Sequence, residues 1–444
     1  MKKLLTSITS LMLAIVMLLG MLSMTACGGT GTGDGEPTVD AEGNTIIKIM
    51  FHVDKSSTEG QAYQKRIDAF NQAYKDQKIK AQPIFKARSA GASGYETELL
   101  NNQIEGTLAD IITFDAPNTA AYASSGLLYD ITDLIPAEEQ ANFYSLNKYE
   151  GRLYGVPVQE SSAGFFYNKK IFRAAGIDVS GYTAEHPWTF AQFKDVCARL
   201  KAHGVTAVDM RINATTDEMA PYLLYPFAYA AGGEYVSADG YTAQGYYNSA
   251  ATAKGFQFIK DLITEEYTSY AIGATDFFTG KVGMYLSSGW TIPEIENKYR
   301  DYFASRDDWG ILPYPKASEN SEAASATGSW SYAITNNHHA DKTAILELYK
   351  WMISAESSDA ITTATGMIPA RKDVSRSYVE GSPEYTLLKQ LELSGRERPV
   401  TVAYPTFSST FNQVIFGLKD GNVSDLLNSA ASTLQSEMDK HKKQ

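Results

Sequence analysis

Residues that carry most enzyme chemistry are scarce in this sequence. The 444 residues include only two cysteines, and the six histidines show no zinc-binding spacing. Neither a GxxxxGK[ST] phosphate-binding loop nor a GxSxG nucleophile turn occurs. Lys and Arg number 39 against 51 Asp and Glu, and the net charge of −12 disfavours contact with nucleic acid. We therefore expect no metal, no cofactor and no nucleic-acid partner.

Long apolar runs are equally rare, and the one clear example lies at the N-terminus. Lys2-Lys3 precedes residues 4–24, which are almost wholly apolar or small. This arrangement is typical of a secretory signal peptide, which we assign to residues 1–26. Its end, Thr25-Ala26-Cys27, resembles the lipobox of bacterial lipoproteins, although Met24 stands where Leu is usual. The resemblance implies lipidation of Cys27, and an ordinary signal peptide or an anchor helix is the alternative.

Glycine dominates the segment that follows Cys27. We interpret residues 27–44 as a flexible tether, because glycine-rich polar chain cannot bury a core. A lipid on Cys27 would hold the folded body at the extracellular face of the cytoplasmic membrane, and the glycine spacer and lysine-rich start favour a Gram-positive host. Cys197 would then have no disulfide partner, and we expect it to be a small buried residue.

The folded body begins with alternating strand and helix patterns. Strands are expected at 46–51, 78–85 and 110–115, and the helix over 95–105 is expected to bury Leu99, Leu100 and Ile104. This β-α-β-α-β order favours a parallel sheet covered by helices, and such sheets bind ligands beyond the carboxyl ends of their strands. Four residues are therefore expected at one rim, namely His52, Asp54 and Lys55 after the first strand and Asp115 at the end of the third.

The remaining length and the aromatic content narrow the possibilities further. About 400 residues exceed a single hydrophobic core, so two lobes are expected. Further helices are expected over 190–203, 218–231, 250–264, 343–354 and from about residue 423. The 28 Tyr, 19 Phe and 5 Trp are suited to surfaces that recognise sugar rings or peptides, although many would serve the core.

Six segments resemble family 1 extracellular solute-binding proteins, which are the capture components of ABC importers. They cover the range from about 45 to 435 and are residues 109–134 (ADIITFDAPNTAAYASSGLLYDITDL), 150–169 (EGRLYGVPVQESSAGFFYNK), 187–193, 278–285, 288–290 and 366–371. Each segment alone is weak evidence for the family. The resemblance is specific because all six occur in the same order as in the family.

The resemblance implies an α/β protein of two periplasmic-binding-protein-like lobes, each a mainly parallel sheet with flanking helices. The ligand would bind in a cleft at the hinge, and the lobes would close around it. Each lobe would be discontinuous, with residues 45–158 and 328–366 in the first lobe and 159–327 and 367–444 in the second.

Polar ligand-binding candidates lie at the strand ends and crossings. Asp115 could bind ligand or cap the next helix. Glu160 lies in the expected crossing, and its alternative is a solvent-exposed hinge residue. Arg371 could pin a carboxylate or a sugar hydroxyl, or only hold its turn. His52, Asp54 and Lys55 are possible contacts from the first loop.

Aromatic candidates would stack on the faces of sugar rings. Trp290 and Trp330 each follow a short Gly-Ser or Ser-Gly stretch at a strand boundary, where a core role is less expected. Tyr222 matches a stacking Tyr of the maltodextrin-binding relatives, or else it is one turn of an amphipathic helix. Tyr404 lies in an expected late aromatic loop, where packing is the alternative.

These expectations combine into a lipid-anchored substrate-binding protein of a carbohydrate ABC importer. It would capture a sugar or oligosaccharide by lobe closure and deliver it to the permease, working as a monomer and not as an enzyme. One alternative is another small solute such as glycerol phosphate, which would need a cationic cradle. The other is a secreted carbohydrate-active enzyme, in which Asp115 and Glu160 would form a carboxylate pair.

Overall fold

The computed structural model describes residues 38–88, 94–213, 218–328, 330–336, 340–374 and 376–442. All of them belong to one compact unit, which contains two β-sheets with their helices. The signal peptide, Cys27 and most of the predicted tether lie outside the described residues. Along the described part of the chain, no helix is both long and apolar enough to cross a membrane.

The first sheet has six strands in the order β2-β1-β3-β12-β5-β4. β1 is parallel to both β2 and β3, and the three remaining pairs are antiparallel. The predicted parallel arrangement thus holds for the first three strands only, and β12, from much later in the chain, pairs antiparallel with β3 and β5. The strands are β1 (Thr45–Phe51), β2 (Ile79–Phe85), β3 (Ile111–Asp115), β4 (Asn147–Tyr149), β5 (Arg152–Pro157) and β12 (Trp330–Ile334).

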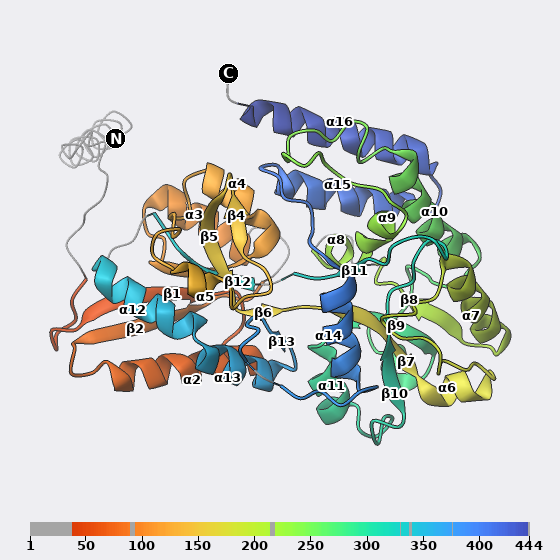
Figure 1. The fold of residues 1–444 in the computed structure, drawn as a ribbon, viewed down its shortest axis with the longest axis horizontal. Coiled ribbons are helices and arrows are strands. Elements are labelled where there is room, and N and C mark those ends of the chain that lie inside the picture. The colour runs from red at the N-terminus through yellow and green to blue at the C-terminus, as the bar shows by residue number, and fades with distance from the viewer. Residues whose placement is uncertain are drawn as a thin grey trace, which may run out of the picture. The chain divides into compact units, whose positions relative to one another are not determined.

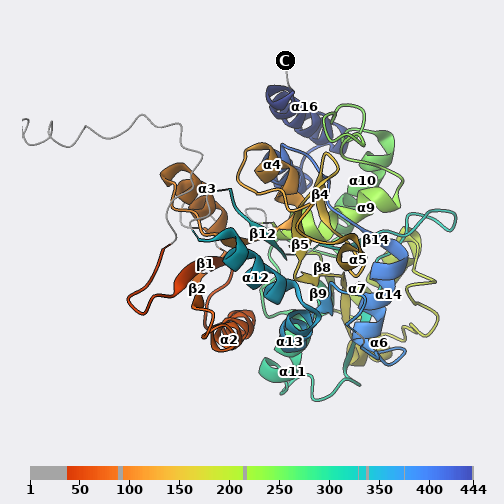
Figure 2. The ribbon, with the colours of Figure 1, turned by 60° about the vertical axis from the view of Figure 1, so that its left-hand side comes forward.

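Helices from two distant stretches of sequence cover this sheet. Figures 1 and 2 show α12 and α13, from late in the chain, beside α2 and β1. We call the first sheet and these helices the first lobe. Its helices are α2 (Thr58–Ala73), α3 (Tyr95–Glu105), α4 (Thr119–Ser124), α12 (Lys342–Ile353) and α13 (Ala355–Thr365), with the single turns η1 (Ala116–Asn118) and α5 (Ala137–Gln140) between strands.

The second sheet has four strands in the order β10-β7-β9-β8, and only β8 and β9 are parallel. Its strands are β7 (Ala163–Asn168), β8 (Thr206–Asp209), β9 (Val282–Ser288) and β10 (Trp309–Leu312). With its helices it forms the second lobe. These are α6 (Lys169–Ala174), α7 (Phe190–Ala202), α8 (Met219–Leu224), α9 (Pro226–Ala230), α10 (Ala250–Thr264), η2 (Phe277–Thr279), α11 (Thr291–Lys298), α14 (Pro383–Ser394), α15 (Tyr404–Gly417) and α16 (Val423–His441).

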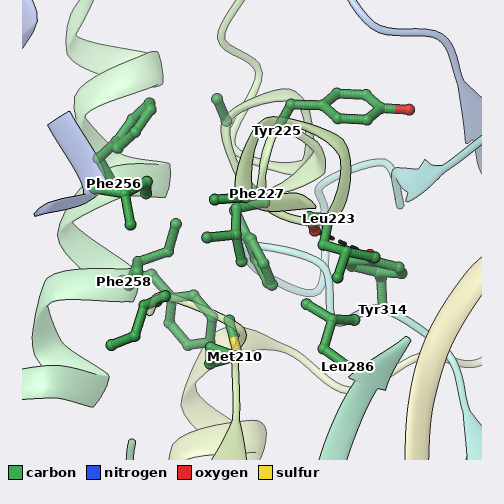
Figure 3. Close-up of a cluster of buried hydrophobic side chains, with 14 of the residues drawn as sticks. Met210, Leu223, Tyr225, Phe227, Phe256, Phe258, Leu286 and Tyr314 are labelled. Carbon is green, nitrogen blue, oxygen red and sulfur yellow. Dashed lines mark hydrogen bonds between the residues drawn. The ribbon is translucent and has the colours of Figure 1, made fainter. Parts of the chain in front are cut away.

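An aromatic core holds the helices of the second lobe onto its sheet. Figure 3 shows Phe227, Phe256 and Phe258 from the helices in one buried cluster with Leu286 of β9. Tyr314 is also fully buried there, and its hydroxyl donates to the carbonyl of Leu223 at 2.9 Å. Much of the aromatic excess is thus used in packing. Cys197 is buried in the same core, as predicted.

Short crossing strands join the two lobes. β6 (Gln159–Glu160) pairs with β13 (Ile368–Pro369), and β11 (Ser325–Ala326) pairs with β14 (Gly395–Arg396). The two main crossings are also bonded to one another, because the amide of Ser161 donates to the carbonyl of Gly328 at 2.8 Å. We call this bonded pair of segments the hinge region.

Three local expectations differ from the structure. Leu100 and Ile104 are 45% and 85% exposed, because Tyr95 and Leu99, four residues apart, form the buried face of α3. The expected helix over 218–231 is divided into α8 and α9 at Pro226, which begins the second piece. The expected aromatic loop at Tyr404 is the start of helix α15.

Candidate ligand-binding cleft

A cavity of about 250 Å³ lies between the lobes, beyond the ends of β1 and β3. Both lobes and the crossings contribute to it. The first lobe supplies His52, Glu59, Arg88, Asp115, Trp330 and Thr365, the second lobe supplies Glu218, Met219, Tyr222, Trp290 and Arg398, and the hinge region supplies Gln159, Ser161, Gly328 and Met367.

The indole of Trp330 forms the aromatic surface of the first lobe. It stacks on the imidazole of His52 with ring centroids 3.4 Å apart and planes at 2°. The guanidinium of Arg88 lies 5.2 Å from the indole centroid. Burial, together with the charge of Arg88, holds the pKa of His52 well below its ordinary value, so the ring is neutral. Its Nδ1 lies 3.0 Å from the hydroxyl of Thr113.

Tyr222 and Trp290 form the aromatic surface of the second lobe. Their ring centroids lie 5.9 Å apart at an angle of 40°. The Tyr222 hydroxyl donates to the carbonyl of Ser161, which ties the second-lobe helix α8 to the hinge. Trp290 is half-buried and packs against the second-lobe core on one side. Each lobe therefore presents a partly exposed indole at the cavity.

A buried ion-pair network crosses the cavity from one lobe to the other. The guanidinium of Arg398 donates to both oxygens of Asp115 at 2.5 and 3.0 Å and to Glu218 at 2.7 Å. The side chains of Arg398 and Asp115 are each 4% exposed. Arg88 lies 3.6 Å from Asp115 and donates to Glu96 at 2.7 Å. Asp115 makes no side-chain capping bond to the next helix, so the capping alternative is excluded.

Glu59 is the remaining carboxyl of the cavity. Its Oε1 accepts from the Tyr63 hydroxyl at 2.8 Å and from Nε2 of Gln159 at 3.4 Å. Nε2 of His52 lies 3.6 Å from the same oxygen. Burial raises the pKa of Glu59 to about 7, against these bonds, which lower it.

Glu160 lies in the hinge rather than in the cavity. It is buried, so the alternative of a solvent-exposed hinge residue is excluded. It accepts from the hydroxyls of Ser145 at 2.6 Å and Thr327 at 2.9 Å. Burial raises its pKa to about 7. It also lines a second, much smaller cavity of about 20 Å³ that it shares with Arg398.

Five of the ten predicted ligand-binding residues line the cavity, namely His52, Asp115, Tyr222, Trp290 and Trp330. Tyr404 lies behind it, with its hydroxyl on Glu218. Asp54 and Lys55 are exposed in the loop before α2. Arg371 is bound to Glu139, Asp373 and the carbonyl of Ile353, so it holds its turn.

Sequence reasoning missed Glu59, Arg88, Glu218 and Arg398. Glu59 follows Ser57, which caps α2, so it has the pattern of an ordinary first-turn acid. The other three lie in connecting segments without a motif. Among the described residues, no group of three or more His, Cys, Asp or Glu side chains could hold a metal ion.

Comparison with known families identifies the class of this protein. The sequence profile of the bacterial extracellular solute-binding proteins matches residues 54–358, which is more than half of the chain. The chain belongs to this family. Because the family consists of binding proteins, the prediction of a binding protein rather than an enzyme is confirmed.

Individual relatives of this solute-binding protein are distant. The diacetylchitobiose-binding protein DasA of Streptomyces coelicolor is 25% identical over 390 residues, which is 82% of each chain. The sn-glycerol-3-phosphate-binding periplasmic protein UgpB of Salmonella paratyphi A is 23% identical over 344 residues, 73% of this chain and 74% of UgpB.

A solved structure confirms the two-lobed α/β fold of this solute-binding protein. The cyclic α-maltosyl-1,6-maltose-binding protein from Arthrobacter globiformis has a TM-score of 0.73 at 21% identity. The similarity covers 90% of this chain and 100% of that protein.

Proposed function

We propose that this protein captures a small uncharged sugar outside the cell and delivers it to the permease of an ABC importer. The observation that carries the proposal is the inter-lobe cavity with a partly exposed indole from each lobe, Trp290 and Trp330. Aromatic faces bind the C–H faces of sugar rings, while nearby polar groups bind the hydroxyls. The names of DasA and of the Arthrobacter protein, both of which state a saccharide ligand, support this choice.

The size of the cavity favours a short ligand. The cavity volume of about 250 Å³ lies below the roughly 300–1,000 Å³ of sites for drug-sized ligands. This space suits one or two sugar rings better than a long chain. We therefore propose a monosaccharide or disaccharide as the ligand of the form described here.

The charge pattern favours an uncharged sugar over glycerol phosphate, which the name of UgpB suggests. Arg398 is already bound to Asp115 and Glu218, and Arg88 is bound to Glu96. A phosphate would have to displace these carboxylates from the guanidinium groups. Lys55 and Arg371, the other candidates for a cationic cradle, are not among the lining residues.

The finer features of the proposal concern anchoring and assembly. We propose that Cys27 carries the lipid that holds a monomeric protein at the outer face of the cytoplasmic membrane, and that the lobes follow the boundaries predicted from the sequence. Mass spectrometry of the membrane-extracted protein tests the anchor. An unmodified N-terminus without diacylglycerol on Cys27 would contradict it.

A thermal-shift screen followed by calorimetry tests the ligand class. The probes are glucose, N-acetylglucosamine, maltose, diacetylchitobiose and glycerol 3-phosphate. A ligand that binds only the native state raises the melting temperature, so at least one sugar should raise it while glycerol 3-phosphate does not. Stabilisation by glycerol 3-phosphate alone would overturn the sugar proposal.

A further inference from the structure

Only one of the three carboxyl groups at the cavity lacks an arginine partner. Asp115 and Glu218 are both bound to Arg398. Within the described part of the chain, Glu59 makes no ion pair with Lys or Arg, and the basic side chain beside it is the imidazole of His52 at 3.6 Å. Asp115, the acceptor expected from the sequence, is thus paired with arginine, and Glu59 is not.

We infer that Glu59 is the carboxylate that accepts hydrogen bonds from the hydroxyls of the bound sugar and so determines specificity. The inference rests on the proposed function, because it assigns the polar half of the same site. Glu59 was not among the ligand-binding candidates found from the sequence.

The geometry of Glu59 leaves one oxygen available. All of its contacts, from Tyr63, Gln159 and His52, are made to Oε1. No described residue hydrogen-bonds Oε2, and the side chain is 22% exposed although it lines the cavity. Three neighbours on Oε1 hold the carboxyl in one orientation. A fixed acceptor of this kind distinguishes a hydroxyl from a hydrogen at the same ring position.

The position of Glu59 also places it beside the aromatic surface of the first lobe. It lies in the first turn of α2, directly after the loop from β1, and contacts His52, on which Trp330 stacks. A sugar ring bound against Trp330 would therefore lie on the side of the cavity that also contains Glu59. Apolar and polar recognition elements are combined within one corner of the cleft.

The groups around Glu59 titrate in other pH ranges, so a change in affinity near pH 7 can be assigned to Glu59. The titratable groups that face it are His52 at the end of β1, Tyr63 on α2 and Tyr332 on β12, with Arg88 beyond His52. Burial keeps the pKa of both tyrosines well above and that of His52 well below their ordinary values. A hydroxyl donor favours the ionised carboxylate, so the bound sugar lowers the pKa of Glu59. Affinity should therefore fall as pH decreases below about 7.

The test compares Glu59→Gln with Glu347→Gln by calorimetry, using whichever of the four sugars above binds the wild type. Glu347 is a matched control, since it also accepts a tyrosine hydroxyl, that of Tyr74 at 2.7 Å, and lies on α12 of the same lobe outside the cavity. We expect E59Q to weaken binding at pH 8 at least tenfold and to remove the loss of affinity between pH 8 and pH 5.5. E347Q should retain the wild-type affinity and pH profile.

The outcomes separate the two proposals. Equal affinity and an equal pH profile for E59Q and wild type would overturn the role of Glu59 and leave the sugar-binding function standing. A wild type that binds none of the sugars would overturn the proposed function and this role with it. The melting temperatures of both variants, measured without sugar and compared with that of the wild type, identify a loss of affinity that arises from misfolding. In that case Glu59→Asp tests whether a shorter carboxylate restores part of the pH dependence.

Discussion

Trp290 is the cleft residue whose contact with the ligand can be tested most directly. It is half-buried at the start of α11, and the neighbouring ring of Tyr222 is independently held by the hinge carbonyl of Ser161. Trp290→Ala should weaken sugar binding at least tenfold, because a lost aromatic contact of this kind is worth about 1 kcal/mol or more. Calorimetry measures the effect. Tyr246→Ala, which removes an exposed second-lobe aromatic, is the control, and equal affinities for both variants would remove Trp290 from the site.

Glu160 gives the hinge a pH-dependent stability. Its pKa is about 7 in the folded protein and about 4.3 when unfolded. Between these values the native state binds more protons than the unfolded state, so the stability supplied by the protonated carboxyl is complete below about pH 4 and is lost as pH rises through 7.

Glu160→Gln should remove this dependence, because glutamine resembles the protonated acid and can still bond Ser145 and Thr327. The difference in melting temperature between the variant and the wild type should increase in favour of the variant from pH 5 to pH 8. At pH 8 it should correspond to a gain of up to about 3 kcal/mol in the free energy of unfolding. Differential scanning calorimetry across this range checks the result. A constant difference would show that Glu160 does not titrate there.

The sequence predicted where some site residues lie, but it did not predict which residues they bind. The end of a strand places Asp115 at the cavity, and this is local information. Its partner Arg398 lies 283 residues away, in a segment with no motif, so the ion pair follows only from the fold. Arg371 illustrates the same limit, because Glu139, which binds it, lies 232 residues earlier.

At the level of elements, the crossing before β12 depends on a residue without a side chain. A Cβ at Gly328 would lie 3.0 Å from Nη2 of Arg398 and 3.6 Å from a ring carbon of Tyr222. Gly328→Ala should therefore disturb the Arg398 network and weaken sugar binding severalfold, with a smaller effect on the melting temperature. Gly181→Ala, where a Cβ meets nothing within 4 Å, is the control. Unchanged affinity in G328A would show that the network has room to move.

Elements with a clear local pattern could be predicted, and those defined by distant packing could not. The range 95–105 of α3 and 250–264 of α10 agree with the structure, since both have clear ends and periodic apolar residues. The inward face of α3 differs because its burial depends on where the sheet lies. Tyr404 was expected in a loop, whereas it begins α15, where Pro405 in the first turn is compatible with a helix.

For the whole molecule, Asp115 and Arg398 form a buried two-bond ion pair between the lobes at the cavity. Removing one partner of a buried ion pair is usually strongly destabilising because the other charge is left alone. Here each group has a second partner in its own lobe. Arg398 is also bound to Glu218, and Asp115 lies 3.6 Å from Arg88. The lobes can therefore separate without leaving either charge unpaired, which makes the pair suited to a hinge motion.

Asp115→Asn should shift the ligand-free protein toward an open arrangement, because Arg398 then keeps its bond to Glu218 and loses its charged partner across the cleft. Small-angle X-ray scattering should show a larger radius of gyration for ligand-free D115N than for wild type, and saturating sugar should bring the two values together. Asp133→Asn removes an 88% exposed carboxylate of the first lobe and should change neither value. If ligand-free D115N and wild type have the same radius of gyration, the ion pair does not control closure, and the energy of closing must come from the ligand and the hinge alone.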